Sequence, residues 1–269
     1  MRCDFGMTNN DSQKPIYLFV HLPKCAGTSI IKSLSRVGKR KYIILSDSPE
    51  SKLQALSDLQ AELKRGRQQL DDIDLVMGHD VFHGIHSLAQ RPAAYFSFLR
   101  DPVTRYVSHY RYLSDCAKNR RSPIHEFAKN KMAPDGRLLS IQESIDRQYF
   151  SNVMTNHLAA ANDPDLTTKR WKIEDPQRLY ELAATFLDSM DFIGFVETIS
   201  QDTETICQKL GLPSSMRLTN LSKTHLETAL DESVIAGIKQ LNDLDQPLYE
   251  HALLLRKQNK SSDRAIAEP

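Results

Sequence analysis

Five short apolar runs, rich in β-branched and aromatic residues, constrain the fold of this 269-residue chain more than any other feature. They are Ile16–Val20, Tyr42–Leu45, Asp74–Met77, Tyr95–Leu99 and Phe192–Val196. Most lack strict alternation of apolar and polar residues, as expected of strands that are covered on both faces. Helical patterns lie between them, at 29–37, 51–70, 101–112 and 198–210. Strands that alternate with helices predict an α/β fold with a doubly wound, mainly parallel sheet flanked by helices.

The stretch from about 115 to 190 departs from this alternation. It has a helical and polar pattern, with prolines at 123, 134, 164 and 176, and we expect it to be a helical insertion. Because no repeat or low-complexity linker divides the chain, the sequence predicts a single domain over residues 1–256 that contains this insertion. Residues 257–269 are polar, and we expect them to form a flexible C-terminal tail.

Charge and cysteine usage narrow the class of function. The formal net charge of +1 gives no case for a nucleic-acid or membrane partner, so an anionic ligand must be held by a local patch. The four cysteines, at positions 3, 25, 116 and 207, fit neither a zinc site nor a disulfide framework, and we expect reduced thiols. The first apolar run is too short for a signal sequence or a membrane span, which predicts a cytoplasmic protein.

The first predicted strand leads into a loop that has the parts of an anion site. Gly27 permits close backbone approach, the following helix directs N–H groups at a ligand, and Thr28 and Ser29 add hydroxyls. Lys24 precedes Gly27 by three residues and no hydroxyl residue follows the lysine directly, so this is not a Walker A loop. By itself the loop fits a phosphate site and an ordinary strand–turn–helix about equally well.

A second phosphate site is indicated where another strand ends and a helix begins. Arg100 lies at the strand end, where its guanidinium can fork a phosphate, and Ser108 lies two turns into the helix. Asp101 and Pro102 are typical of a helix start, at the N-cap and first helical positions. The alternative interpretation of this stretch is a helix cap with a surface salt bridge.

Both stretches resemble the carbohydrate sulfotransferases of sulfotransferase family 2, closest to the branch that includes heparan and chondroitin sulfotransferases. Residues 19–29 are similar to the 5′-phosphosulfate loop of these enzymes, and residues 99–110 fill their 3′-phosphate motif Arg-Asp-Pro-x-x-Arg-x-x-Ser-x-Tyr. The resemblance implies a P-loop-type fold and an O-sulfotransferase that uses 3′-phosphoadenosine 5′-phosphosulfate (PAPS), releases PAP and requires no metal.

The resemblance also implies roles for individual residues. The 5′-phosphosulfate would lie on Lys24, Cys25, Ala26, Gly27, Thr28 and Ser29. Arg100 and Ser108 would hold the 3′-phosphate, and the segment with Asn220 and Ser222 would close over the nucleotide. Arg105 is expected to be a structural partner of the turn.

His79 is the predicted base, because it directly follows a strand and has an unperturbed pKa near 6.5. Lys24 can support the leaving phosphate oxygen. Relatives carry a Gly-His pair here, and in the heparan 2-O-sulfating branch that histidine is assigned as the base. That branch has a second histidine where this chain has Met77, which implies a different acceptor or a simpler base arrangement. His21 and His109 are weaker alternatives.

His83 and His86 raise the alternative of a metal site, since on a helix they would share a face with His79. The lack of an HExxH glutamate and the presence of Gly84 argue against it. We interpret both histidines as surface or acceptor-pocket residues.

The acceptor is expected to be a hydroxyl of a glycan or of another small molecule. A basic stretch at 117–137 could steer an anionic glycan or be a solvated loop, and Trp171 could stack on a sugar. Two other functions stay open: a P-loop kinase or NTPase, and a non-catalytic module that binds PAP or another nucleotide.

Overall fold

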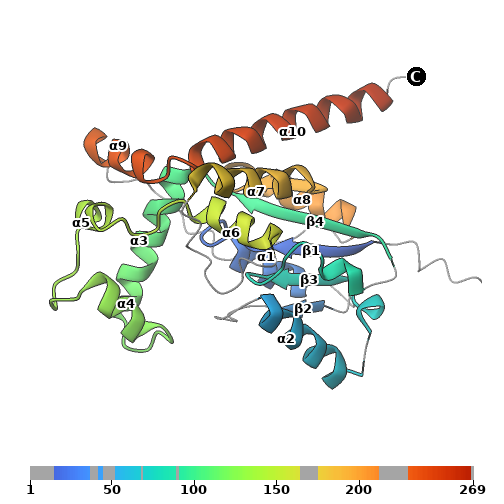
Figure 1. Ribbon diagram of the computed structural model, residues 1–269, viewed down its shortest axis with the longest axis horizontal. Helices are drawn as coiled ribbons and strands as arrows, with labels where there is room; N and C mark the ends of the chain where they lie inside the picture. The colour runs from blue at the N-terminus through green and yellow to red at the C-terminus, as the bar shows by residue number, and fades with distance from the viewer. Residues whose placement is uncertain are drawn as a thin grey trace, which may run out of the picture.

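The computed structural model describes residues 15–36, 42–44, 52–67, 69–88, 91–163, 175–211 and 230–267. Its centre is a sheet of five parallel strands in the order β2-β3-β1-β4-β5 (Figure 1). The strands are β1 (Ile16–Val20), β2 (Tyr42–Ile44), β3 (Leu75–Gly78), β4 (Ala93–Leu99) and β5 (Phe192–Phe195). Each arises from one of the five apolar runs, so the predicted parallel α/β sheet is confirmed.

Helices cover both faces of the sheet, which explains why the strands lack polar alternation. One face is covered by α1 (Gly27–Arg36) and α8 (Ile199–Lys209), and β1 contributes Phe19 to this core. The other face is covered by α6 (Val153–Asn162), α7 (Pro176–Asp188) and α10 (Asp245–Ala267), and here β1 contributes Leu18. Helix α2 (Lys52–Arg65) buries Leu59 in the same core as Leu18.

A third core lies beside the sheet, around α3 (Pro102–Lys118). It joins α3 to α4 (His125–Met132), α5 (Ile141–Asp146) and α9 (Glu232–Leu241), which lie together to the left of the sheet in Figure 1. The start of α3 is as predicted, because the Asp101 carboxylate accepts a hydrogen bond from the backbone N–H of Thr104 at 2.9 Å and Pro102 is the first helical residue. This cap fixes the direction in which α3 leaves the sheet.

The expected insertion at 115–190 contains helices of two kinds. Helices α4 and α5 stand away from the sheet, whereas α6 and α7 pack against it and bury Met154, Leu158 and Phe186 in its core. The polar pattern and the prolines did not separate these two groups, because both are helical and only long-range packing distinguishes them.

The C-terminal helix is longer than expected. Helix α10 runs without a break from Asp245 to Ala267, so it includes most of the residues expected to form a tail. The sequence from 257 onward has no Gly and no Pro before position 269, so nothing in the backbone chemistry ends the helix there. None of the helices in the described part of the chain combines the length and apolar character that a membrane crossing requires.

The chain adds strands on both sides of β1: β3 and β2 lie on one side, and β4 and β5 lie on the other. Val20, the last residue of β1, lies opposite Gly78 of β3 on one side and Ser97 of β4 on the other. The Ser97 hydroxyl donates a hydrogen bond to the carbonyl of Val20 at 2.8 Å, which ties β4 to this end of β1. In open α/β sheets, ligands bind in the crevice beyond the carboxyl ends of the strands, at the point where the strand order reverses in this way.

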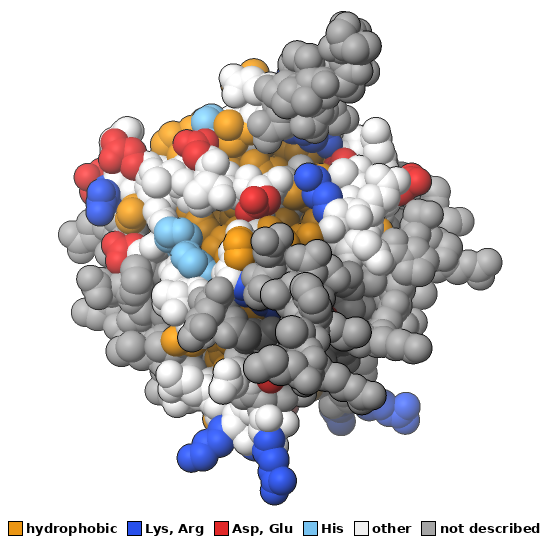
Figure 2. Space-filling model, turned by 90° about the vertical axis from the view of Figure 1, so that its right-hand side faces the viewer, with side chains coloured by type: hydrophobic (Ala, Val, Ile, Leu, Met, Phe, Trp, Pro, Cys, Tyr) orange, Lys and Arg blue, Asp and Glu red, His pale blue; other side chains and the backbone are white. Residues whose placement is uncertain are grey.

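On the face shown in Figure 2, the described acidic and basic side chains are scattered among apolar and uncharged groups, without a large patch of one sign. This agrees with the net charge of +1. Any strong binding of an anion must therefore come from a local arrangement of charges.

Candidate functional site

A cavity of about 380 Å³ lies at the reversal point, beyond the carboxyl end of β1. Its lining comes from the segments that follow β1, β3, β4 and β5, and from α3. The described lining residues are His21, Pro23, Lys24, Ala26, Gly27, Thr28, Ser29, His79, Arg100, Ser108, His109, Tyr112 and Val196. The structure thus brings together every described residue of the predicted site except Cys25.

The loop between β1 and α1 has a strained backbone. Lys24 and Ala26 adopt left-handed φ values of 68° and 62°, which cost non-glycine residues about 1–3 kcal/mol each. Such a curled backbone presents N–H groups on its concave side, and the N-terminus of a helix adds further donors. The loop is therefore built to receive an anion.

Cys25 is the exception among the predicted loop residues. Its side chain is buried in the core between α6 and the sheet, and its thiol lies 3.7 Å from the carbonyl oxygen of Pro23. Its backbone N–H is bonded to the carbonyl of Leu22. Burial raises the pKa of the Cys25 thiol to about 12. The Cys25 side chain therefore anchors the loop from behind, and a contact between Cys25 and the ligand stays a prediction.

Two cations line the cavity, the buried Arg100 and the half-buried Lys24. Nη1 of Arg100 donates to the backbone carbonyl of Lys24 at 3.3 Å, and its Nε donates to the Thr104 hydroxyl at 3.1 Å. The pKa of Lys24 is lowered mainly by burial and then by repulsion from Arg100, and burial also lowers the pKa of Arg100. No carboxylate is among the described residues that line the cavity. A bound anion beside these two cations would favour their charged forms.

Helix α3 supplies the wall opposite the loop. The ring of Tyr112 lies under the Lys24 ammonium, with Nζ 4.0 Å from the ring centroid. Ser108 is one turn earlier on the same helix and also lines the cavity. Next to it, His109 stacks on Phe150 at 4.2 Å between ring centroids. The pKa of His109 is well below its ordinary value because of burial and nearby cations, so this imidazole is neutral near pH 7.

His79, at the end of β3, is held in one orientation. Its Nδ1 lies 2.7 Å from the carbonyl oxygen of His21. Because a carbonyl only accepts hydrogen bonds, Nδ1 carries the proton in the neutral ring and Nε2 carries the lone pair. Helix α6 adds a contact through His157, whose Nε2 lies 3.2 Å from the carbonyl oxygen of His79. The geometry suits His79 to accept a proton at Nε2.

His83 and His86 lie apart from the described lining of the cavity. Their rings pack against Tyr95, and Nδ1 of His86 lies 3.0 Å from the Tyr95 hydroxyl. Residues 85–88 form a 3-10 turn, so the helical face that would align them with His79 does not exist. Within the described ranges, no three His, Cys, Asp or Glu side chains gather as metal ligands would.

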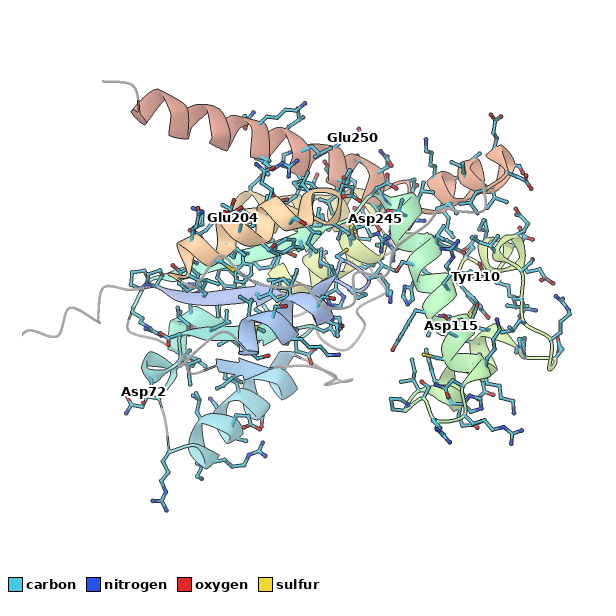
Figure 3. All side chains as sticks on the ribbon, turned by 180° about the vertical axis from the view of Figure 1, so that it is seen from behind. Asp72, Tyr110, Asp115, Glu204, Asp245 and Glu250 are labelled. Atoms are coloured by element: carbon cyan, nitrogen blue, oxygen red, sulfur yellow. The ribbon has the colours of Figure 1, made fainter. Side chains whose placement is uncertain are left out.

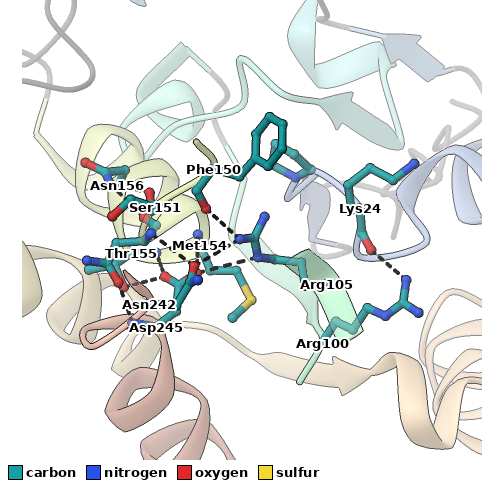
Figure 4. A network of polar contacts seen from close by, with 12 residues as sticks. Lys24, Arg100, Arg105, Phe150, Ser151, Met154, Thr155, Asn156, Asn242 and Asp245 are labelled. Atoms are coloured by element: carbon teal, nitrogen blue, oxygen red, sulfur yellow. Dashed lines mark hydrogen bonds and ion pairs between the residues drawn. The ribbon is translucent and has the colours of Figure 1, made fainter. Parts of the chain in front are cut away.

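Arg105 has a structural role, but the residues that it contacts lie outside the turn in which α3 begins. Its guanidinium is fully buried, donates to the carbonyl of Phe150 at 2.8 Å, and lies 3.6 Å from the Asp245 carboxylate (Figure 4). Asp245 also accepts a hydrogen bond from the Thr155 backbone at 2.8 Å. Asp245 lies where α10 meets α3 and α6 (Figure 3), so this ion pair holds the wall of the cavity against the main core.

The basic stretch at 117–137 borders a separate cavity of about 410 Å³, between α3 and α4. Its lining includes Lys118, Arg120 and Lys129. Lys118 and Lys129 are in the last turns of α3 and α4, where a cation stabilises the helix dipole. That local role accounts for both lysines without a ligand.

Sequence reasoning ranked some residues of the site too low. His21 was a weak candidate, although its position directly after a strand could have marked it, and Tyr112 and His157 were not singled out. Tyr112 is one turn beyond Ser108 on α3, a spacing that could have placed it on the same face. His157 carries no such signal. Asn220, Ser222 and Trp171 lie outside the described residues.

Comparison with known proteins identifies the family of the chain. Residues 11–252 match the model of the sulfotransferase family. No curated protein sequence matches the chain. A solved sulfotransferase from Alicyclobacillus acidocaldarius is similar over 85% of this chain and 95% of its own, with 14% sequence identity and a TM-score of 0.42. Because the family match spans most of its 269 residues, the chain belongs to the sulfotransferase family.

Proposed function

We propose that the protein is a PAPS-dependent O-sulfotransferase that transfers a sulfuryl group to a hydroxyl of a carbohydrate acceptor. Membership of the family implies PAPS as the donor. The observation that best supports the proposal is the cavity in which Lys24 and Arg100 lie at a phosphate-type loop with His79 beside them, and in which no described lining residue is a carboxylate. PAPS carries anionic groups at its two ends, and the cavity offers two cationic positions on different strand ends.

In this proposal each end of the donor has its own binding residues. The backbone of the loop from Lys24 to Ser29 holds the 5′-phosphosulfate, with hydroxyl contacts from Thr28 and Ser29. Arg100 and Ser108 hold the 3′-phosphate, which distinguishes PAPS from ATP. Asn220 and Ser222 are proposed to close over the nucleotide.

The transfer step is proposed to use two of these residues directly. Nε2 of His79 takes the proton from the acceptor hydroxyl, and the resulting oxygen attacks the sulfur in line with the bond to the bridging phosphate oxygen. That sulfur–oxygen bond breaks as the new one forms, and Lys24 stabilises the negative charge that develops on the bridging oxygen. The products are the sulfated acceptor, PAP and a protonated His79, which returns its proton to water.

The experiment is transfer of labelled sulfate from PAPS to a panel of glycans and small alcohols, with PAP binding measured separately by calorimetry. We expect transfer without added ATP, and tighter binding of PAP than of ATP. Magnesium-dependent turnover of ATP with no transfer from PAPS would instead indicate a kinase or NTPase. Binding of PAP without transfer to any acceptor would indicate a non-catalytic module.

Two substitutions separate donor binding from chemistry. His79→Ala should reduce turnover by about 10²–10⁴-fold, the usual contribution of a general base, and leave PAP affinity unchanged. Arg100→Ala should weaken PAP binding by about 1.5–3 kcal/mol, the value of a hydrogen bond to a charged group. Wild-type turnover in His79→Ala would remove that residue as the base.

A further inference from the structure

His21 contacts His79 through both its ring and its backbone. The two imidazole rings stack with centroids 3.9 Å apart and an interplanar angle of 19°. The backbone carbonyl of His21 lies 2.7 Å from Nδ1 of His79. The backbone N–H of His21 donates a hydrogen bond to the Gly78 carbonyl at 3.0 Å. One residue therefore fixes the position of the His79 ring and also the nitrogen on which its proton lies.

The His21 ring is itself held on its other sides. The Phe19 ring is nearly parallel to it, at 5.9 Å between centroids and 15° between planes. Gly27 lies so close that a Cβ at this position would be 1.8 Å from Cδ2 of His21. The ring thus fills the space between the glycine of the loop and the face of His79, which connects the loop mechanically to the predicted base.

The electrostatic state of His21 suits a supporting residue and not a proton acceptor. Burial lowers its pKa well below the ordinary value, and repulsion from His79 and Lys24 lowers it further, so the ring is neutral near pH 7. Among the described residues, its ring nitrogens make no hydrogen bond in the structure. A neutral aromatic face against His79 can stabilise the imidazolium that forms when His79 takes a proton.

We propose that His21 is a positioning residue, whose ring holds His79 by stacking in the rotamer that keeps Nδ1–H on the His21 carbonyl, as proton transfer at Nε2 requires. This inference rests on the proposed function of His79 as the base. Under this proposal His21 is not a second base, because it contributes the flat face of its ring and not a nitrogen that accepts a proton.

The test compares His21→Ala, which removes the ring, with His21→Phe, which keeps a flat ring but no nitrogen. We expect His21→Ala to lower kcat by about 10–100-fold, as for a catalytic group displaced by about 1 Å, with little change in PAP affinity. His21→Phe should recover most of the lost rate. His251→Ala, which removes a histidine on α10 outside the cavity lining, is the matched control and should retain the wild-type rate.

A second readout does not depend on activity. Nitrogen NMR of the protein labelled in its histidines should show His79 as the Nδ1–H tautomer in the wild type and in His21→Phe, and a mixture of tautomers in His21→Ala. If no variant transfers sulfate, the proposed function fails while this measurement still tests the role of His21. Wild-type kcat in His21→Ala, an inactive His21→Phe that remains folded, or an Nε2–H tautomer in the wild type would each overturn the inference.

Discussion

Replacing Gly27 by alanine should disturb both stability and catalysis through one specific contact. The three atoms nearest to a Cβ at position 27 all belong to the His21 ring, at 1.8, 2.1 and 2.5 Å. Ordinary contacts of a Cβ begin near 3.4 Å, so the ring must move by roughly 1.5 Å or the loop must shift by a similar distance. The His21 ring cannot retreat freely, because His79 is stacked on one of its faces.

The expected magnitudes follow from this displacement. Overpacking of this kind costs about 1–3 kcal/mol of unfolding free energy, which is a few degrees in Tm for a chain of this size. A displacement of about 1 Å at a reacting group costs about 10²-fold in rate. We therefore expect Gly27→Ala to lower kcat by about two orders of magnitude. The φ of Gly27 is not left-handed, so the alanine backbone adds no strain of its own.

A double-mutant cycle with His21→Ala tests the reasoning without any activity assay. Unfolding by denaturant would be measured for the wild type, both single variants and the double variant. In the His21→Ala background, Gly27→Ala should leave the free energy of unfolding unchanged or raise it by about 0.4–1 kcal/mol, because alanine reduces the entropy of the unfolded chain. The same loss of stability from Gly27→Ala in both backgrounds would show that the His21 ring is not the obstacle.

Two other features of the site give expected outcomes. Because burial and Arg100 lower the pKa of Lys24 below 10.5, kcat/KM for PAPS should fall with rising pH earlier than for an ordinary lysine, as the ammonium is lost. Arg100→Gln removes the repulsion from Arg100 and should therefore shift the alkaline fall in kcat/KM to higher pH. If this fall stays at the same pH, Lys24 is not the group that causes it. Arg105→Met leaves the fully buried Asp245 without its cation and should cost about 3–5 kcal/mol in denaturant unfolding. The double variant Arg105→Met with Asp245→Asn should lose less than the two single losses combined, and strictly additive losses would contradict the pairing.

The sequence by itself determined the parallel sheet and the positions of the site-bearing turns. Short apolar runs and helical periods are local signals, so they placed all five strands and the starts of α1 and α3 within a few residues. Parallel strands share one carboxyl edge, so the strand-end residues Lys24, His79 and Arg100 could be brought to one crevice before any contact was known.

Only the tertiary structure decided what surrounds these residues. The carbonyl of His21 meets His79 across 58 positions, and Arg105 bonds to Asn242 across 137 positions. Such pairings depend on how helices cross and strands align, and they leave no period in the sequence. The same reason explains why α6 and α7 were not separated from α4 and α5, and why the burial of the Cys25 side chain could not be predicted. The loop pattern identifies residues near an anion, whereas left-handed turns at Lys24 and Ala26 decide which side chains face it.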